Sequence, residues 1–328
     1  MTTILPADVT IRVPRKEELE AICEMLNACD LADCGMPDSP LEQLRADWLD
    51  EKFHPETDAR LAVAPGERIV GYATVGRYKN VHVRFEARVH PDYRGRGIGS
   101  HLLAFVERRA QDFVPLASPE VRVALSTWCH SGNTSGKQLL EAADFTCNRH
   151  TWAMAIDLPD EPPQPEWPAG ITLRPFVPER DARAVFEAVE EAFEDHWGHL
   201  PSAFEDWYQR RTINNERFDP SLWFVALDGD QIAGVSLCDY YLDAGIVDTL
   251  AVRRPWRRLG LGLALLRHSF GEYYRRGMHK VVLGVDSQNL TGATRLYERA
   301  GMYIELSYDT YEKELRPGIE LSTQALEA

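Results

Sequence analysis

Two glycine-rich segments of this chain have the composition of a loop that binds phosphate groups. The first runs from Arg94 to Gly99 and the second from Arg257 to Gly262, and each lies between an extended segment and a long amphipathic helix. Glycine lets the backbone approach a ligand closely, and the unpaired N–H groups at a helix N-terminus favour an anion such as pyrophosphate. The sequence therefore predicts a phosphate-binding loop in each half of the chain.

Two familiar phosphate-binding motifs do not fit these segments. A Walker A loop requires a lysine that neither segment contains, and a dinucleotide fingerprint requires a third glycine where the chain has Ser100 or Leu265. Both segments instead match the pattern [RQ]-x-x-G-x-[GA], each time after a Val-x-x-x-[YW] sequence.

The chain repeats itself at an interval of just over 160 residues. Arg12 and Arg174 lie 162 residues apart, and Gly71 and Gly234 lie 163 apart, as do the two loops. A register kept over so many elements indicates duplicated domains, which a length of 328 residues also favours.

A proline-rich stretch at 158–170 separates the two copies and favours a stiff, extended connection. We therefore predict an N-terminal domain at 1–157, a linker at 158–170 and a C-terminal domain at 171–328.

Each copy shows the same order of periodic segments. In the second copy we expect helices at 181–193, 260–276 and 291–300, and strands at 171–174, 222–227, 231–237, 246–252, 280–285 and 304–312. Asp228-Gly229-Asp230 is a strong hairpin signal, whereas the strand–helix–strand segment requires a parallel pair. The predicted fold is α/β, with a mixed, mostly antiparallel sheet flanked by helices in each copy.

With these loops and this order of elements, the sequence resembles the GCN5-related N-acetyltransferase (GNAT) superfamily, whose acyl-CoA pyrophosphate loop has the form found here twice. The resemblance covers nearly the whole chain, and two-copy members, including mycothiol synthase-like proteins, share the architecture. It implies two tandem GNAT domains that use acetyl-CoA as the acyl donor.

The resemblance also implies the cofactor contacts. In this superfamily the strand before the loop contacts the pantetheine and the thioester through its backbone, so the implied residues are strand and loop positions of both copies together with one asparagine. They are Leu250, Ala251, Val252, Arg257, Arg258, Leu259, Gly260, Leu261, Gly262 and Asn289 in the second copy, and Ala87, Arg88, Val89, Arg94, Gly95, Arg96, Gly97, Ile98 and Gly99 in the first.

Catalytic roles are implied for the second copy only. Asn289 and Tyr297 stand in the family pattern N-x(6)-[LF]-Y-x(3)-G-[FM], in which the tyrosine is the general acid for the departing thiolate. The first copy has Leu140 opposite Tyr297, and Asp144 in place of the final glycine. We therefore expect the C-terminal copy to be catalytic and the N-terminal copy to be degenerate and non-catalytic.

The general base has a weaker signal. Asp248 lies two residues before Leu250, so strand alternation would place both side chains on one face. The acidic residues Glu190, Glu191, Glu194 and Asp195 end the first helix of this copy, and a solvated face is the simpler interpretation of them.

The amino-acid composition limits the kinds of partner that the chain is expected to bind. A net charge of −15 argues against nucleic-acid binding and favours small cationic substrates, and no apolar run approaches the length that spans a membrane. Six cysteines without framework spacing and an N-terminus without an export signal indicate a cytoplasmic protein. We expect no metal, because His196 and His199 lack further residues at ligand spacing. Two fused copies also favour a monomer that acts as an internal pseudo-dimer.

The predicted function is transfer of an acetyl group from acetyl-CoA to a primary amine of a small molecule by direct attack. A non-catalytic acyl-CoA sensor or scaffold and a protein N-acetyltransferase remain open as alternatives. A mycothiol-type amino sugar is one acceptor that the resemblance allows, but no residue specifies it.

Overall fold

Strands and helices follow one another along the chain in the predicted order, twice. The structure is a computed structural model that describes residues 5–78, 81–215, 217–289 and 292–324. The chain divides into a first unit, Met1–His150 with Ser307–Leu321, and a second unit, Thr151–Leu306 with Ser322–Ala328. The α/β fold with a mixed sheet in each copy is confirmed.

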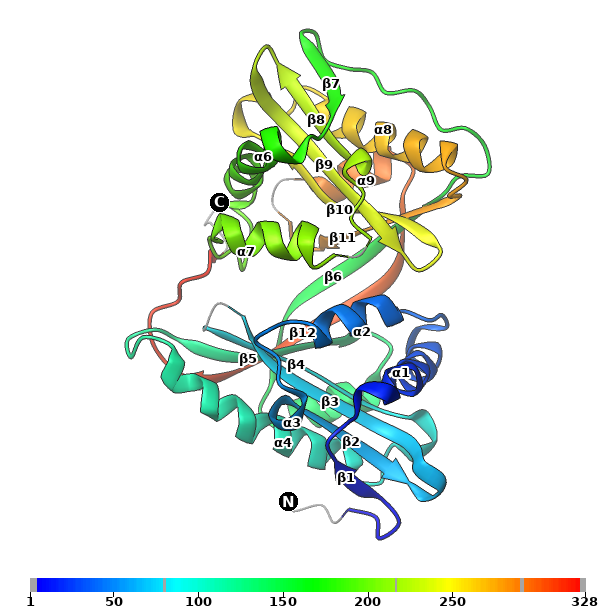
Figure 1. Ribbon diagram of the computed structural model, residues 1–328, viewed down its shortest axis with the longest axis vertical. Helices are drawn as coiled ribbons and strands as arrows, with labels where there is room; N and C mark the ends of the chain where they lie inside the picture. The colour runs from blue at the N-terminus through cyan, green and yellow to red at the C-terminus, as the bar shows by residue number, and fades with distance from the viewer. Residues whose placement is uncertain (1–4, 79–80, 216, 290–291, 325–328) are drawn as a thin grey trace. The chain divides into compact units, whose positions relative to one another are not determined.

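The first unit contains six strands and five α-helices of the first copy, counted over the described residues (Figure 1). The strands are β1 (Thr10–Arg12), β2 (Ala59–Ala64), β3 (Arg68–Tyr78), β4 (His82–Val89), β5 (Val123–His130) and the start of β6 (Thr146–Asp157). The helices are α1 (Leu19–Cys34), α2 (Leu41–Trp48), α3 (Pro55–Asp58), α4 (Ile98–Phe113) and α5 (Thr134–Glu141).

The second unit repeats this order with the elements of the second copy. Its strands are β7 (Ile171–Pro175), β8 (Trp223–Asp228), β9 (Gln231–Tyr241), β10 (Ala244–Val252), β11 (Lys280–Asp286) and the start of β12 (Tyr303–Arg316). Its helices are α6 (Pro178–Phe193), α7 (Phe204–Tyr208), α8 (Leu261–Arg275) and α9 (Ala293–Arg299), and Thr291, where the last of these was predicted to begin, lies outside the described residues.

In each unit the strands combine antiparallel hairpins with one parallel pair of neighbouring strands. In the first unit β1 to β4 are antiparallel neighbours and β4 pairs in parallel with β5. In the second unit β7 to β10 are antiparallel neighbours and β10 pairs in parallel with β11.

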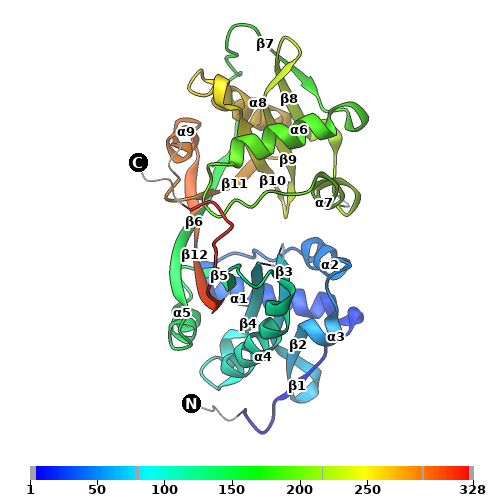
Figure 2. The ribbon, with the colours of Figure 1, turned by 90° about the vertical axis from the view of Figure 1, so that its left-hand side faces the viewer.

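Helices cover both faces of the sheet in each unit, because central strands such as β2, β8 and β9 bury side chains on both of their faces. α4 packs on β3 and β4 in a core that includes Leu102 and Phe85, while α1 packs on the other face around Ile22 and Tyr72. In the second unit α8 covers one face, and α6 runs along β9 and β10 on the other (Figure 2).

The final strand of each copy contributes to both units, so the units differ from the predicted domains. Thr151–Asp157 of β6 pair with β11 of the second copy, and Tyr308–Arg316 of β12 pair with β5 of the first. The proline-rich segment belongs to the second unit, where Leu158 is buried and Trp167 packs against the core. Alternation identifies a strand, but not the neighbour with which it pairs.

Across the described residues, no helix combines the length and the apolar composition needed to cross a membrane.

Candidate active site

Each predicted phosphate loop leads directly into a helix. α4 begins at Ile98 and α8 at Leu261, and the glycine before each helix, Gly97 or Gly260, has a left-handed backbone with φ of 83° or 88°. The first N–H groups of a helix have no acceptor within it, so each helix start can bind an anion.

The two loops differ at one conformationally demanding position. Gly95 has φ of 74°, and Arg258, which occupies the corresponding place in the second loop, has φ of 65°. This left-handed region disfavours any residue that carries a Cβ atom. The second loop therefore holds strain that the first avoids.

A second glycine in each loop allows two helices to approach closely. A Cβ atom on Gly99 would lie 2.9 Å from Leu139 of α5, and one on Gly262 would lie 3.1 Å from Leu296 of α9. These glycines therefore position α5 and α9 against the helix that begins at the phosphate loop.

The first arginine of each loop binds to protein groups. Arg94 Nε donates to the Val89 carbonyl at 3.1 Å, and its two Nη atoms reach the Asp33 carboxylate at 2.6 and 3.0 Å. Arg257 Nε donates to Val252 in the same way at 3.1 Å. Both side chains thus fasten the loop to the strand before it, which leaves the backbone N–H groups as the part of the loop that could bind phosphate.

The strand before each loop separates from its parallel neighbour. β4 pairs with β5 only over His82–Arg84, and β10 pairs with β11 only at Gly245 and Ile246. Beyond these positions the described strands part, so that backbone groups of 87–89 and 250–252 face a gap. This is the geometry that the resemblance implies for a thioester contact.

In the first unit the gap opens into a cavity of about 360 Å³. Strand β4 and the loop supply most of the lining residues predicted for this copy, namely Ala87, Arg88, Val89, Arg94, Gly95, Gly97 and Gly99. Two other predicted residues lie elsewhere, because Ile98 is buried in the core and Arg96 covers the Tyr93 ring at 4.8 Å. The cavity thus lies in the copy that was expected to be degenerate.

Other residues that line this cavity were not predicted from the sequence. β5 contributes Thr127, Trp128 and Cys129, and α5 contributes Ser135 and Gly136. No local pattern distinguishes them, because the three-dimensional arrangement of β5 and α5 beside β4 brings them to the gap.

The predicted cofactor contacts of the second copy differ in burial and in the face of the sheet on which they lie. Leu250 and Val252 pack beside the core under α8, whereas Ala251 is buried on the α6 face. Leu261 is buried, and Leu259 is exposed. The Asn289 N–H donates to the Asp286 carbonyl at 3.0 Å, which folds the chain after β11.

Tyr297 lies on α9 and is 9% exposed. Burial raises the pKa of its hydroxyl to about 12, so the side chain carries its proton at neutral pH. In the first unit Leu140 takes this place in α5 and is equally buried, which fills the space without supplying a proton.

Asp248 does not share a face with Leu250 as alternation predicted. A β-bulge interrupts the β9–β10 ladder between Val247 and Thr249, so that Val247 packs in the same core as Leu250. Asp248 instead forms an ion pair with Arg211 and accepts a hydrogen bond from Thr249 at 2.9 Å.

The acidic residues at the end of α6 pair with the arginines that follow β10. Glu191 binds Arg253 at 2.6 Å, and Arg254 binds Glu194 at 3.0 Å and Asp195 at 2.8 Å. Several of these groups are partly exposed, and together they hold the end of α6 to the segment that enters the loop.

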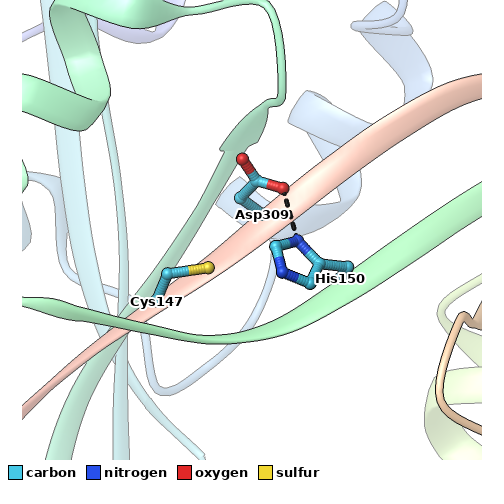
Figure 3. A group of neighbouring side chains, drawn as sticks. All are labelled: Cys147, His150 and Asp309. Atoms are coloured by element: carbon cyan, nitrogen blue, oxygen red, sulfur yellow. Dashed lines mark hydrogen bonds and ion pairs between the residues drawn. The ribbon is translucent and has the colours of Figure 1, made fainter.

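One group of side chains has the composition of a metal site. The ligand atoms of Cys147, His150 and Asp309 lie within 4.8 Å of one another (Figure 3). His150 Nδ1 lies 2.8 Å from an Asp309 oxygen, and that carboxylate also binds Ser131 at 2.7 Å and the Lys137 ammonium group. The lysine charge already balances the carboxylate, so these contacts account for the cluster as a hydrogen-bonded network.

The sequence matches the acetyltransferase (GNAT) family over residues 19–124 and 182–302. It is 31% identical to a mycothiol acetyltransferase of Stackebrandtia nassauensis, over 93% of this chain and 100% of that protein. A mycothiol acetyltransferase of Streptomyces scabiei is 30% identical, over 78% of each chain.

Solved structures match as well. A GCN5-related N-acetyltransferase from Sphaerobacter thermophilus superposes with a TM-score of 0.86 and 41% identity, over 98% of this chain and 100% of that one. A tandem GNAT protein from the clavulanic acid biosynthesis pathway has a TM-score of 0.71 and 16% identity, over 95% and 100% of the two chains, and supports the tandem fold alone.

Proposed function

The chain belongs to the acetyltransferase (GNAT) family and is an enzyme of that class, and from this premise we propose that its second unit transfers an acetyl group from acetyl-CoA to a primary amine of a small molecule. The proposal is supported by three features of one unit: a helix start at Leu261 that follows a glycine-rich loop, a parted strand at 250–252 and a buried, protonated tyrosine, Tyr297.

These groups fit acetyl-CoA by their chemistry. The glycine-rich start of α8 suits the pyrophosphate, and the parted backbone of β10 suits the pantetheine and the thioester carbonyl. Bound acetyl-CoA supplies an activated acetyl group; the amine nitrogen forms the new C–N bond while the C–S bond breaks. Tyr297 gives its proton to the departing sulfur.

The amine must lose a proton in the same reaction. Asp248 remains our candidate for the base, acting directly or through water. Its carboxylate forms an ion pair with Arg211. If Asp248 acts as the base, its carboxylate must contact both Arg211 and the substrate amine or a bridging water.

For the first unit we propose binding of a CoA thioester without turnover. The lining of its cavity by the 94–99 loop and by β4 supports binding, and Leu140 in place of the tyrosine argues against proton donation. The acceptor of the second unit is best sought among amines related to mycothiol, because the relatives bear that name.

The test is release of free CoA thiol from acetyl-CoA in the presence of amino sugars, including a mycothiol-type amine, other small amines and a peptide N-terminus. We expect turnover with a small amine, and Tyr297→Phe should lower kcat by about 100-fold, as loss of a general acid does. Tyr274→Phe, in α8 of the same unit, is the control and should retain the wild-type rate.

The pH profile gives an independent measure. Because the pKa of Tyr297 is raised to about 12, its ionisation should not reduce kcat between pH 7 and 10. If Tyr297→Phe kept the wild-type rate and profile, the acid assignment would be wrong, and binding of CoA without turnover of any amine would favour the sensor alternative.

A further inference from the structure

Arg88 of β4 carries buried hydrogen-bond donors that the protein does not use. Its side chain leaves the strand on the face opposite Phe85, which packs with α4, and it approaches α1, where Nη1 lies 3.7 Å from Asp30. The residue is only 5% exposed. Among the described residues, neither Nη atom has a hydrogen-bond partner.

An unpaired guanidinium group in the interior is uncommon, because buried donors normally have acceptors. Arginine keeps its charge under all ordinary conditions and cannot avoid the cost by losing a proton. The two nearest carboxylates do not satisfy the Nη donors, since Glu86 accepts only from Nε, at 3.2 Å, and Asp30 lies beyond hydrogen-bond distance of Nη1.

Asp30 is itself occupied by other groups. It accepts from the Ser39 hydroxyl at 2.7 Å and from the Asp38 N–H at 3.2 Å, and His130 Nε2 lies 3.4 Å away. The donors on the Nη atoms are therefore unpaired, and because both atoms are enclosed, a group that enters from outside would reach them by displacing a neighbouring side chain.

That group would enter through the cavity of the first unit, which both Arg88 and Trp128 line. The Arg88 guanidinium lies over the Trp128 ring at 4.8 Å. Trp128 is in turn held edge-on by Tyr308 and His130, with ring centroids 5.2 and 5.8 Å away. The guanidinium plane is thus fixed before any ligand arrives.

The position of Arg88 indicates which part of a ligand reaches it. The 94–99 loop lines the same cavity and suits the pyrophosphate, while Arg88 belongs to the strand segment proposed to contact the thioester. A group at Arg88 is therefore at the acyl end, either the tail of the acyl chain or a second molecule next to it.

We propose that the cavity of the first unit takes a ligand with a carboxylate group, bound by the two Nη atoms of Arg88. A planar guanidinium presents parallel donors that match the two oxygens of a carboxylate. This inference rests on the proposal that the first unit binds a CoA thioester. The carboxylate is carried either by the acyl group of that thioester or by a separate small molecule beside CoA.

The second unit lacks this device. Ala251 stands at the position that corresponds to Arg88, and its side chain is buried in the core between the sheet and α6. A preference for carboxylates should therefore belong to one of the two units and should depend on Arg88.

Calorimetry on the full-length chain tests the proposal with succinyl-CoA, butyryl-CoA and acetoacetyl-CoA, and with succinate added to a CoA-saturated protein. We expect one of two results. Either one site binds succinyl-CoA about 10-fold or more tightly than butyryl-CoA, as charged hydrogen bonds to a buried group permit, or succinate binds to the CoA-saturated protein. The first result would place the carboxylate on the acyl group, and the second on a separate molecule.

Two substitutions assign the preference. Arg88→Gln should abolish it, whereas Arg84→Gln, an exposed residue on the same strand, should keep it. If Arg88→Gln does not fold, as judged by circular dichroism, Arg88→Lys retains a charge without the planar fork and should lose most of the preference.

Two outcomes would overturn the proposal. One is affinity for succinyl-CoA equal to that for butyryl-CoA or acetoacetyl-CoA when succinate also fails to bind beside CoA, and the other is an unchanged carboxylate preference in Arg88→Gln. The wild-type comparison decides the matter even if no variant folds. Failure of the proposed acetyl transfer is a separate result, seen as absence of thiol release with every amine.

Discussion

Arg258 adopts a left-handed backbone conformation, and glycine, Gly95, occupies the corresponding position of the first copy. Since the left-handed region costs about 1 kcal/mol or more for a residue with a Cβ, Arg258→Gly should raise the free energy of unfolding by up to about 1 kcal/mol. Gly95→Ala should lower it by about 1 kcal/mol. Urea denaturation measures both.

The control is Arg96→Gly, because Arg96 is not among the described residues with positive φ. That change should increase the entropy of the unfolded chain and remove the contact of Arg96 with the Tyr93 ring, and so lower stability by about 1 kcal/mol. A decrease of the same size for Arg258→Gly would show that the second loop is not strained.

Single residues differ in how far the sequence predicts their setting. The contrast between Tyr297 and Leu140 follows from aligning the two copies, and both side chains are buried as helix periodicity requires. Arg88 was predicted only as a cofactor contact on its strand. Its unused donors depend on Asp30 and Trp128, which lie far away in sequence, so no local pattern could reveal them.

At the level of elements, the first helix of the second copy begins earlier than its apolar spacing predicted. α6 starts at Pro178, and Asp181 in its first turn binds Arg174 at 2.6 and 2.8 Å and the Val177 N–H at 2.8 Å. The carboxylate thus joins β7 to the start of the helix. Its two roles, as an ion-pair partner and as an acceptor for a free helix N–H, both stabilise the unit.

We therefore expect Asp181→Asn to lower the free energy of unfolding by about 2 kcal/mol at pH 7. Burial alone would raise the pKa of Asp181, but hydrogen bonds from Arg174 and Arg180 outweigh it and lower the pKa. Stability from a lowered carboxyl pKa is present above the unfolded value of about 3.9 and is lost as the pH falls below it.

The difference between wild type and Asp181→Asn should consequently shrink on acidification from pH 7 to pH 3, in urea titrations at each pH. Glu179→Gln, an exposed acidic residue of the same helical turn, is the matched control and should change stability by less than about 0.5 kcal/mol. A pH-independent difference would contradict the ion-pair explanation.

Most elements could be predicted because their signals are local. Hairpin turns, helix periodicity and glycine-rich loops gave the strands and long helices of both copies. The β-bulge at Asp248 could not be predicted, because a bulge depends on how β9 and β10 align with each other. Short helices such as α7, with five residues, leave too few turns for a periodic pattern.

At the level of the whole molecule, the last strand of the chain completes the sheet of the first unit. Tyr308–Arg316 of β12 pair with β5, and Arg122, just before β5, binds Glu314 at 3.0 Å and Glu320 at 2.9 Å. The sequence repeat indicates the two copies. The apolar alternation of β6 and β12 does not specify which strand each will pair with, so long-range pairing decides which unit receives each final strand.

A fragment of residues 1–157, the predicted N-terminal domain, should therefore fail to unfold cooperatively when heated, because β5 would keep its short parallel pairing with β4 but lose its antiparallel partner β12. Fusing 307–321 to this fragment through a flexible linker should restore a cooperative transition, while the same linker with a scrambled strand should not. Differential scanning calorimetry distinguishes these cases, and a sharp transition in the bare fragment would contradict the expectation.

This pairing also has a consequence for synthesis. His130 and Ser307 lie 177 residues apart in the chain, so at about 5–20 residues per second the ribosome needs roughly 9–35 s to make the partner of β5 after β5 itself. During that interval the nascent first unit presents an open strand edge, which other chains can join. The unit whose translation begins first thus completes its strand pairing only after β12 has been made.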